Sequence, residues 1–158
     1  MSRAFTREED SENAVPDIGE RPVSPHRNLV TQAGMAMIEA ELASLREELA
    51  KAESGADKQR AAVLVRDLRY WMARRENAEL SVPEKGSDVV RFGMAVELES
   101  EDGKSVSWKI VGEDEADPAN GSISHVSPMA RALFGKKVGD VATVNGKEWE
   151  IAGLSAVG

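Results

Sequence analysis

Two runs of regularly spaced apolar residues, separated by a short polar turn, are the feature that most constrains the fold of this chain. The first run follows spacings of 3 and 4 residues and comprises Met35, Ile38, Leu42, Leu45, Leu49 and Ala52. The second repeats this spacing and comprises Ala61, Leu64, Leu68, Trp71, Arg75 and Ala78. Such spacing is typical of a coiled coil, and a helix with one apolar stripe must bury it against a partner. The sequence therefore predicts an antiparallel two-helix coiled coil over residues 31–80.

The residues at the ends of the two runs support this hairpin. Thr31 is a candidate N-cap of the first helix, Gly55 is suited to close it, and Asp57 is suited to cap the second helix. At a rise of about 1.5 Å per residue, arms of about 22 residues would project roughly 30–35 Å as a narrow finger.

The regions on either side of the hairpin differ in composition. Residues 1–30 mix Glu, Asp, Ser and Pro with few apolar side chains, which predicts a disordered acidic tail. Residues 81–88 contain Pro83 and Gly86 and are predicted to be a linker. Residues 89–158 alternate in the manner of β-strands, with Asp-Gly and Asn-Gly turns at 102–103 and 145–146.

We expect the strands of this last region at residues 89–92, 95–99, 105–111, 123–124, 138–144 and 148–154. Ser127 and Pro128 are suited to begin a short helix over residues 129–134. The predicted fold class is α+β, in which the antiparallel coiled coil precedes an antiparallel β domain with one short helix packed on its sheet.

Composition excludes several classes of function. The chain has no cysteine and only two histidines, so disulfides, thiol catalysis and cysteine-ligated zinc are excluded, and any metal would need carboxylate ligands. No apolar run approaches the roughly 18 residues of a membrane span, which predicts a cytoplasmic protein without a membrane partner. The net charge of −8 argues against general nucleic-acid binding, although residues 54–80 carry 6 basic and 4 acidic side chains. With no nucleophile–base pair, phosphate loop or metal-ligand cluster in the sequence, the chain itself is not expected to be an enzyme.

Four stretches of the sequence resemble the GreA/GreB family of bacterial transcription elongation factors. They are Thr31-Gln32-Ala33-Gly34, Phe92-Gly93 through Ile110-Val111-Gly112, Ile123 to Leu133, and Lys137-Val138-Gly139-Asp140. The third is similar to the family's Ser-Pro-x-Ala-Arg-Ala-Leu signature, and the fourth to its Val-Gly-Asp signature. The resemblance covers about residues 30–155 and implies an N-terminal coiled-coil hairpin with an FKBP-like C-terminal domain.

The resemblance also implies a partner and a mode of action. Members of this family dock their C-terminal domain on the rim of the secondary channel of RNA polymerase core and place acidic residues of the coiled-coil tip beside the catalytic magnesium. Two carboxylates on a finger can help to coordinate a second Mg²⁺ during phosphodiester hydrolysis by the polymerase. The protein would be a monomer with no cofactor of its own, sharing at most the Mg²⁺ of the polymerase. By this resemblance the docking residues are Ser127, Pro128, Met129 and Arg131, and the tip residues are Glu53 and Asp57.

The sequence departs from the family at the tip and in the length of the arms. The family pattern Gly-Asp-x-x-Glu-Asn-Ala is replaced by Ser54-Gly55-Ala56-Asp57-Lys58-Gln59-Arg60, and Val126 stands where the family usually has Asp. Each arm is about nine residues, or roughly 13 Å, shorter than in a cleavage factor. A carboxylate held that far from the metal cannot ligate it at the roughly 2 Å that Mg²⁺ requires. We therefore expect a regulator that binds polymerase without strongly stimulating transcript cleavage.

Several alternatives stay open on the sequence alone. The chain is either such a regulator, or an authentic cleavage-stimulating factor acting through Asp57 and Glu53, or a protein similar to the short-coiled regulators of nucleoside diphosphate kinase. Asp57 also has a simpler interpretation as a helix cap. The basic residues of the second arm either contact nascent RNA, DNA or acidic channel walls, or are solvated residues beside the seam. These basic residues are Lys58, Arg60, Arg66, Arg69, Arg74 and Arg75.

Overall fold

The computed structural model describes residues 18–156, which separate into two compact units. One unit contains residues 18–23 and 39–74, and the other contains residues 24–38 and 75–156. The first helix of the hairpin contributes to both units, because its first residues belong to the second unit. The part of the predicted tail at residues 1–17 lies outside the described residues.

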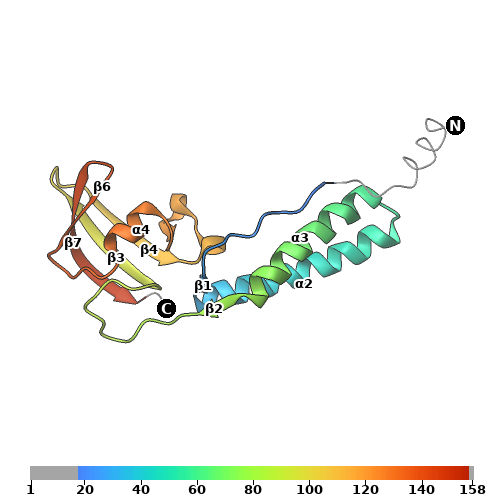
Figure 1. Cartoon of the computed structure of the whole chain (residues 1–158), viewed down its shortest axis with the longest axis horizontal. Coiled ribbons are helices and arrows are strands. Elements are labelled where there is room, and N and C mark those ends of the chain that lie inside the picture. Colours follow the sequence, from blue (N-terminus) through green and yellow to red (C-terminus); the bar gives the residue numbers. More distant parts are fainter. Residues whose placement is uncertain (1–17, 157–158) are drawn as a thin grey trace. The chain divides into compact units, whose positions relative to one another are not determined.

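Two long helices form the hairpin that the apolar spacing predicts (Figure 1). Helix α2 spans Gln32–Ser54, helix α3 spans Lys58–Glu76, and residues 55–57 join them. An ion pair of 3.2 Å between Arg60 and Glu48 links the two arms. The buried apolar side chains of these helices are Ile38, Leu42, Leu45 and Ala52 on α2, and Ala62, Leu64 and Leu68 on α3.

The end of the second apolar run differs from the prediction. Arg74 is fully buried, whereas Arg75, the predicted seam residue, is exposed. After Trp71 the next position on the same helix face lies either three or four residues further on. The nearer residue, Arg74, is the one that is buried. Ala78, the last predicted seam residue, lies in a strand beyond the end of α3.

A short pair of parallel strands, which the sequence did not predict, lies at the two ends of the hairpin. Strand β1 (Asn28–Val30) precedes α2 and pairs with strand β2 (Ala78–Leu80), which follows α3. The sequence assigned residues 28–30 to the disordered tail and residues 78–80 to the coiled coil, so both boundaries move. The pairing is supported by a bidentate contact of 2.9 and 3.2 Å between Arg27 and Glu79, which are 52 positions apart. Local composition does not reveal a strand pairing that is supported by partners so far apart in the sequence.

The second unit contains a mixed five-stranded sheet in the order β5-β4-β3-β7-β6. Four of the strands pair antiparallel as predicted, but β5 pairs parallel with the last three residues of β4, after two 3₁₀ turns have carried the chain back beside Lys109. These turns are η1 (Glu113–Glu115) and η2 (Pro118–Asn120). The strands are β3 (Met94–Ser100), β4 (Ser105–Val111), β5 (Ser122–Ser124), β6 (Val141–Val144) and β7 (Lys147–Ala156).

Two predicted strands are shorter than expected. Residues 89–92 contribute only an isolated bridge from Val89 to Lys137, and the predicted strand at residues 138–144 begins at Val141. The hairpin turns agree with the prediction. Asn145 and Gly146 both have positive φ, 52° and 76°, as a tight turn between antiparallel strands requires.

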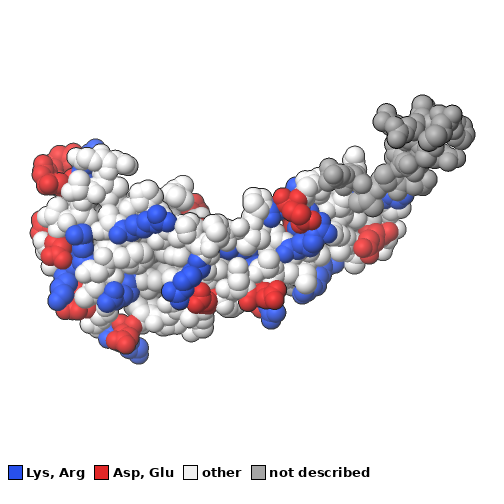
Figure 2. Space-filling view, viewed as in Figure 1, with Lys and Arg blue, Asp and Glu red and all other residues white. Residues whose placement is uncertain are grey.

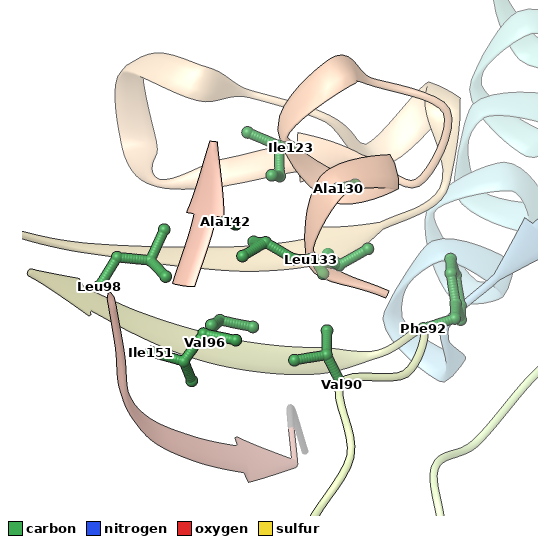
Figure 3. Close-up of a cluster of buried hydrophobic side chains, with 10 residues drawn as sticks. Val90, Phe92, Val96, Leu98, Ile123, Ala130, Leu133, Ala142 and Ile151 are labelled. Carbon is green, nitrogen blue, oxygen red and sulfur yellow. The ribbon is translucent and has the colours of Figure 1, made fainter. Parts of the chain in front are cut away.

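The short helix α4 (Pro128–Leu133) covers one face of the sheet and closes its core. Figure 3 shows Ala130 and Leu133 of this helix in one apolar cluster with Val96 and Leu98 of β3 and Ile151 of β7. All five side chains are buried, so the position of α4 is fixed from the inside. Within residues 18–156, no helix combines the length and the apolar character that a membrane crossing requires.

Candidate functional site

Main-chain hydrogen bonds close the turn at the tip of the helical hairpin. The N–H of Ala56 donates to the carbonyl of Glu53 at 3.2 Å, and the N–H of Asp57 donates to the carbonyl of Ala52 at 2.9 Å. This pair of bonds is the Schellman motif of a helix C-terminus. The left-handed residue is Ala56, with φ of 54°, and not Gly55, because α2 runs far enough for Gly55 to serve as its C-cap.

Asp57 caps α3, as the sequence predicts. Its Oδ1 atom accepts a hydrogen bond of 3.0 Å from the N–H of Arg60, and its carbonyl accepts one of 3.0 Å from the N–H of Ala61. Glu53 is exposed at the same turn, so both predicted tip carboxylates lie at the end of the hairpin. Within residues 18–156, no three His, Asp or Glu side chains are grouped as a metal site would need.

Among the six basic residues of the second arm, Arg60, Arg66 and Arg69 form ion pairs with acidic side chains. Arg74 is buried and Arg75 is exposed, while Lys58 is exposed and forms no ion pair with another described residue. Figure 2 shows positive and negative groups interspersed over α2 and α3 on the face in view, rather than a continuous patch of one sign. The three pairs are Arg60 with Glu48 at 3.2 Å, Arg66 with Asp67 at 3.1 Å, and Arg69 with Glu20 at 2.6 Å.

An N-terminal segment before the hairpin supplies contacts to α3 that the sequence did not predict. The guanidinium of Arg21 lies 4.0 Å from the centroid of the Tyr70 ring and forms an ion pair of 3.4 Å with Asp67. Tyr70 in turn meets Trp71 edge to face at 5.2 Å between ring centroids. The sequence showed only a polar tail here, and no local pattern links residues 20 and 21 to a helix almost 50 positions away.

The predicted docking residues share the turn that begins α4. The Ser127 hydroxyl accepts a hydrogen bond of 3.3 Å from the N–H of Ala130, which makes Ser127 the N-cap. Pro128 occupies the first turn and is exposed, and Arg131 is exposed one turn later. Met129 is half-buried and packs against the core. The turn therefore presents Pro128 and Arg131 to solvent on a helix whose other face is anchored in the core.

A buried histidine lies directly before this turn. His125 is only 8% exposed and packs edge to face on Phe92, with 5.5 Å between the ring centroids. Burial lowers the pKa of His125, and the nearby charge of Glu113 opposes this effect. The Ser24 hydroxyl donates to Glu113 at 3.0 Å, so the segment before β1 lies beside the same region of the domain. No local sequence pattern indicates this cluster, because its members lie far apart along the chain.

Comparison with protein families and curated sequences places these features among known proteins. Residues 84–153 match the family described as transcription elongation factor, GreA/GreB, C-terminal. The transcription elongation factor GreA of Methylobacterium nodulans is 36% identical over 141 residues, a match that covers 84% of this chain and 88% of the relative. The GreA of Thioalkalivibrio sulfidiphilus is 38% identical over 98 residues, and the match spans only 61% of its length.

Solved structures are also similar to this chain, among them one from Thermus thermophilus. The GreA factor homolog 1 (Gfh1) protein of Thermus thermophilus is 28% identical to this chain, with a TM-score of 0.40, and the match covers 83% of this chain and 100% of that protein.

Proposed function

The chain belongs to the GreA/GreB family of transcription elongation factors, and we propose that it binds bacterial RNA polymerase core at the secondary channel as a regulator without strong transcript-cleavage activity. The protein would act in the cytoplasm as a monomer, would not be an enzyme itself, and would at most stimulate the nuclease of the polymerase. Any Mg²⁺ involved would be the polymerase's own.

The docking part of this proposal is supported by the arrangement of buried and exposed residues at the α4 turn. Ala130 and Leu133 are completely buried and hold the helix on the sheet, while Pro128 and Arg131 on the same helix are exposed. An exposed proline and arginine on a rigid element form a contact with a preorganised main chain, because little main-chain freedom is lost on binding. Arginine is also among the residues that most often dominate binding energy in protein interfaces.

The geometry of the tip supports the second half, the weak effect on cleavage. The Asp57 carboxylate caps its own helix through Oδ1, which ties it to the start of α3, and Glu53 is the other predicted tip carboxylate. With 23 residues, α2 is about 34 Å long, and its reach limits where these carboxylates can lie. Lys58 and Arg60 place positive charge beside them, which disfavours approach of the tip to a metal ion.

A binding assay with purified core polymerase tests the docking proposal. The full-length chain should be captured by the polymerase, and the double substitution Pro128→Ala with Arg131→Ala should weaken capture at least tenfold. The matched control is Pro118→Ala with Lys104→Ala, which also removes an exposed proline that begins a short helix and an exposed cation from the same domain. Absence of capture by the native chain, or equal capture of both double variants, would contradict the proposal.

A further inference from the structure

The segment just before β1 passes beside α3 (Figure 1), and its residues Glu20 and Arg21 bind that helix through charged groups. The Glu20 carboxylate contacts Arg69 in a bidentate manner, with 3.0 Å from Nε to Oε2 and 2.6 Å from Nη2 to Oε1. The next residue, Arg21, places its guanidinium over the ring of Tyr70 and pairs with Asp67. Two consecutive side chains thus occupy two neighbouring positions on one face of the helix.

These contacts cover the groups on α3 that a negatively charged partner would use. Arg69 is an exposed cation of the most basic element in the chain, and Glu20 neutralises it in the same fork geometry that arginine offers to a phosphate. Tyr70 is an aromatic surface on which planar groups stack, and Arg21 occupies it. Arg66, one turn earlier, is paired with Asp67 and is only partly exposed.

The contacts are also weak enough to be displaced. Both partners of the Glu20–Arg69 pair are more than half exposed, with side-chain exposures of 63% and 54%. Exposed ion pairs contribute little to stability and are screened by salt, and exposed cation–π contacts are similarly modest. Three such contacts hold the segment, and contacts of this strength can be displaced by a competing charged ligand.

We propose that residues 18–23 form an autoinhibitory strap, in which Glu20 and Arg21 occupy the Arg69–Tyr70 face of α3 and must be displaced before this face binds a linear polyanion. The strap and the face that it covers belong to the same compact unit. The proposal can therefore be tested on this protein alone and does not depend on polymerase binding. If the contact is regulatory, release of the strap raises the affinity for a polyanion. If it only stabilises the hairpin, that affinity stays the same.

The test uses the full-length chain with the double substitution Glu20→Ala and Arg21→Ala, which removes one negative and one positive charge and leaves the net charge unchanged. The probe is a fluorescein-labelled single-stranded DNA 12-mer at low ionic strength, and the readout is fluorescence anisotropy. We expect the double variant to bind at least fivefold more tightly than the native chain. Adding Arg69→Ala or Tyr70→Leu to the double variant should remove the gain.

The matched control is Glu47→Ala with Lys51→Ala, which deletes a charge-neutral and still more exposed ion pair on α2 and should leave affinity unchanged. Thermal melts followed by circular dichroism establish that each variant is folded. Equal affinity of the native chain and the strap variant, including failure of both to bind, would overturn the proposal. A gain that persists after Arg69→Ala and Tyr70→Leu would overturn it as well, because the strap would then not be covering this face.

Discussion

The carboxylate of Glu115 binds the first turn of α2 through Thr31. It accepts a hydrogen bond of 3.1 Å from the main-chain N–H of Thr31 and a second one from the Thr31 hydroxyl. The same carboxylate accepts a bond of 3.0 Å from the N–H of Gly112, and the Thr31 hydroxyl accepts one of 3.0 Å from the N–H of Gly34. Thr31 therefore caps α2 as predicted, and Glu115 joins that cap to the turn η1.

Replacing Glu115 should destabilise the second unit. Glu115→Ala leaves the N–H groups of Thr31 and Gly112 without their acceptor, and a loss of about 1–3 kcal/mol in the free energy of unfolding is expected. Urea unfolding measures this difference. The control is Glu84→Ala, an exposed carboxylate in the linker, which should change stability by less than about 0.5 kcal/mol. Equal effects of the two substitutions would contradict the assigned role of Glu115.

Gly34→Ala should also destabilise the protein, against the usual trend for a helix. Alanine is normally favoured over glycine in a helix by about 1 kcal/mol. Here the added Cβ would overlap Cδ of Glu115, far inside the separation that two non-bonded carbon atoms tolerate. In the Glu115→Ala background the obstacle is gone, and Gly34→Ala should then be neutral or stabilising. A double-mutant cycle by urea unfolding measures this reversal, and simple additivity of the two changes would argue against the contact.

Ala56→Gly should stabilise the tip of the hairpin. Ala56 has a φ of 54°, a left-handed conformation that costs a residue with a Cβ about 1 kcal/mol and costs glycine far less. Thermal unfolding should therefore show a higher midpoint for Ala56→Gly. The neighbouring Gly55 does not have a positive φ, so Gly55→Ala should not show the corresponding loss. A loss at Gly55 without a gain at Ala56 would place the left-handed residue at the position that the sequence suggested.

Substitutions at Asp57 separate its role as a cap from a role for its charge. Asp57→Ala should lower stability by about 1 kcal/mol, whereas Asp57→Asn should retain most of the cap, because an asparagine oxygen accepts the same N–H. On a backtracked polymerase complex, we expect neither the native chain nor these variants to increase transcript cleavage strongly. Strong cleavage with the native chain that is lost in a folded Asp57→Asn protein would instead establish the cleavage-factor alternative.

The stability of the second unit should fall in mild acid because of His125. Burial lowers its pKa in the folded state below the value in the unfolded chain, with His26 and Arg131 acting in the same direction and Glu113 against them. The unfolded state therefore binds the proton more readily, so the contribution of His125 is complete above its unfolded pKa of about 6.5 and is lost as the pH falls. Urea midpoints at pH 8 and pH 5.5 measure this loss, and His125→Gln should reduce the difference. An unchanged difference would assign the acid sensitivity to other groups.

Local patterns in the sequence were sufficient where the structure depends on neighbours along the chain. The spacing of Leu42 and Leu45, the Asn145-Gly146 turn and the Ser127 cap each specify an element within a few residues, and the structure contains all of them. The parallel direction of β5 was missed, because a strand of three residues carries no signal for the direction of its partner.

The remaining differences depend on partners distant in the sequence. Glu115 and Thr31 are 84 positions apart, and Glu20 and Arg69 are 49 positions apart. An acidic residue in a turn or a polar residue in a predicted tail looks the same in the sequence whether or not it meets such a partner. At the tip, the predicted position of the residue that closes α2 was wrong by one residue. Both Gly55 and Ala56 are compatible with the end of a helix, and only the hydrogen bonds in the structure distinguish them.

The β1–β2 pair brings the chain segments on either side of the helical hairpin side by side, with Val30 opposite Leu80. The hairpin therefore begins and ends at the same strand pair. The length of its arms does not change the structure of the β domain that follows. Adding or deleting one heptad in each arm would preserve the apolar seam and change the span by about 10 Å. In such an architecture the length of the hairpin can change one heptad at a time, while the α4 turn and the sheet beneath it keep their structure.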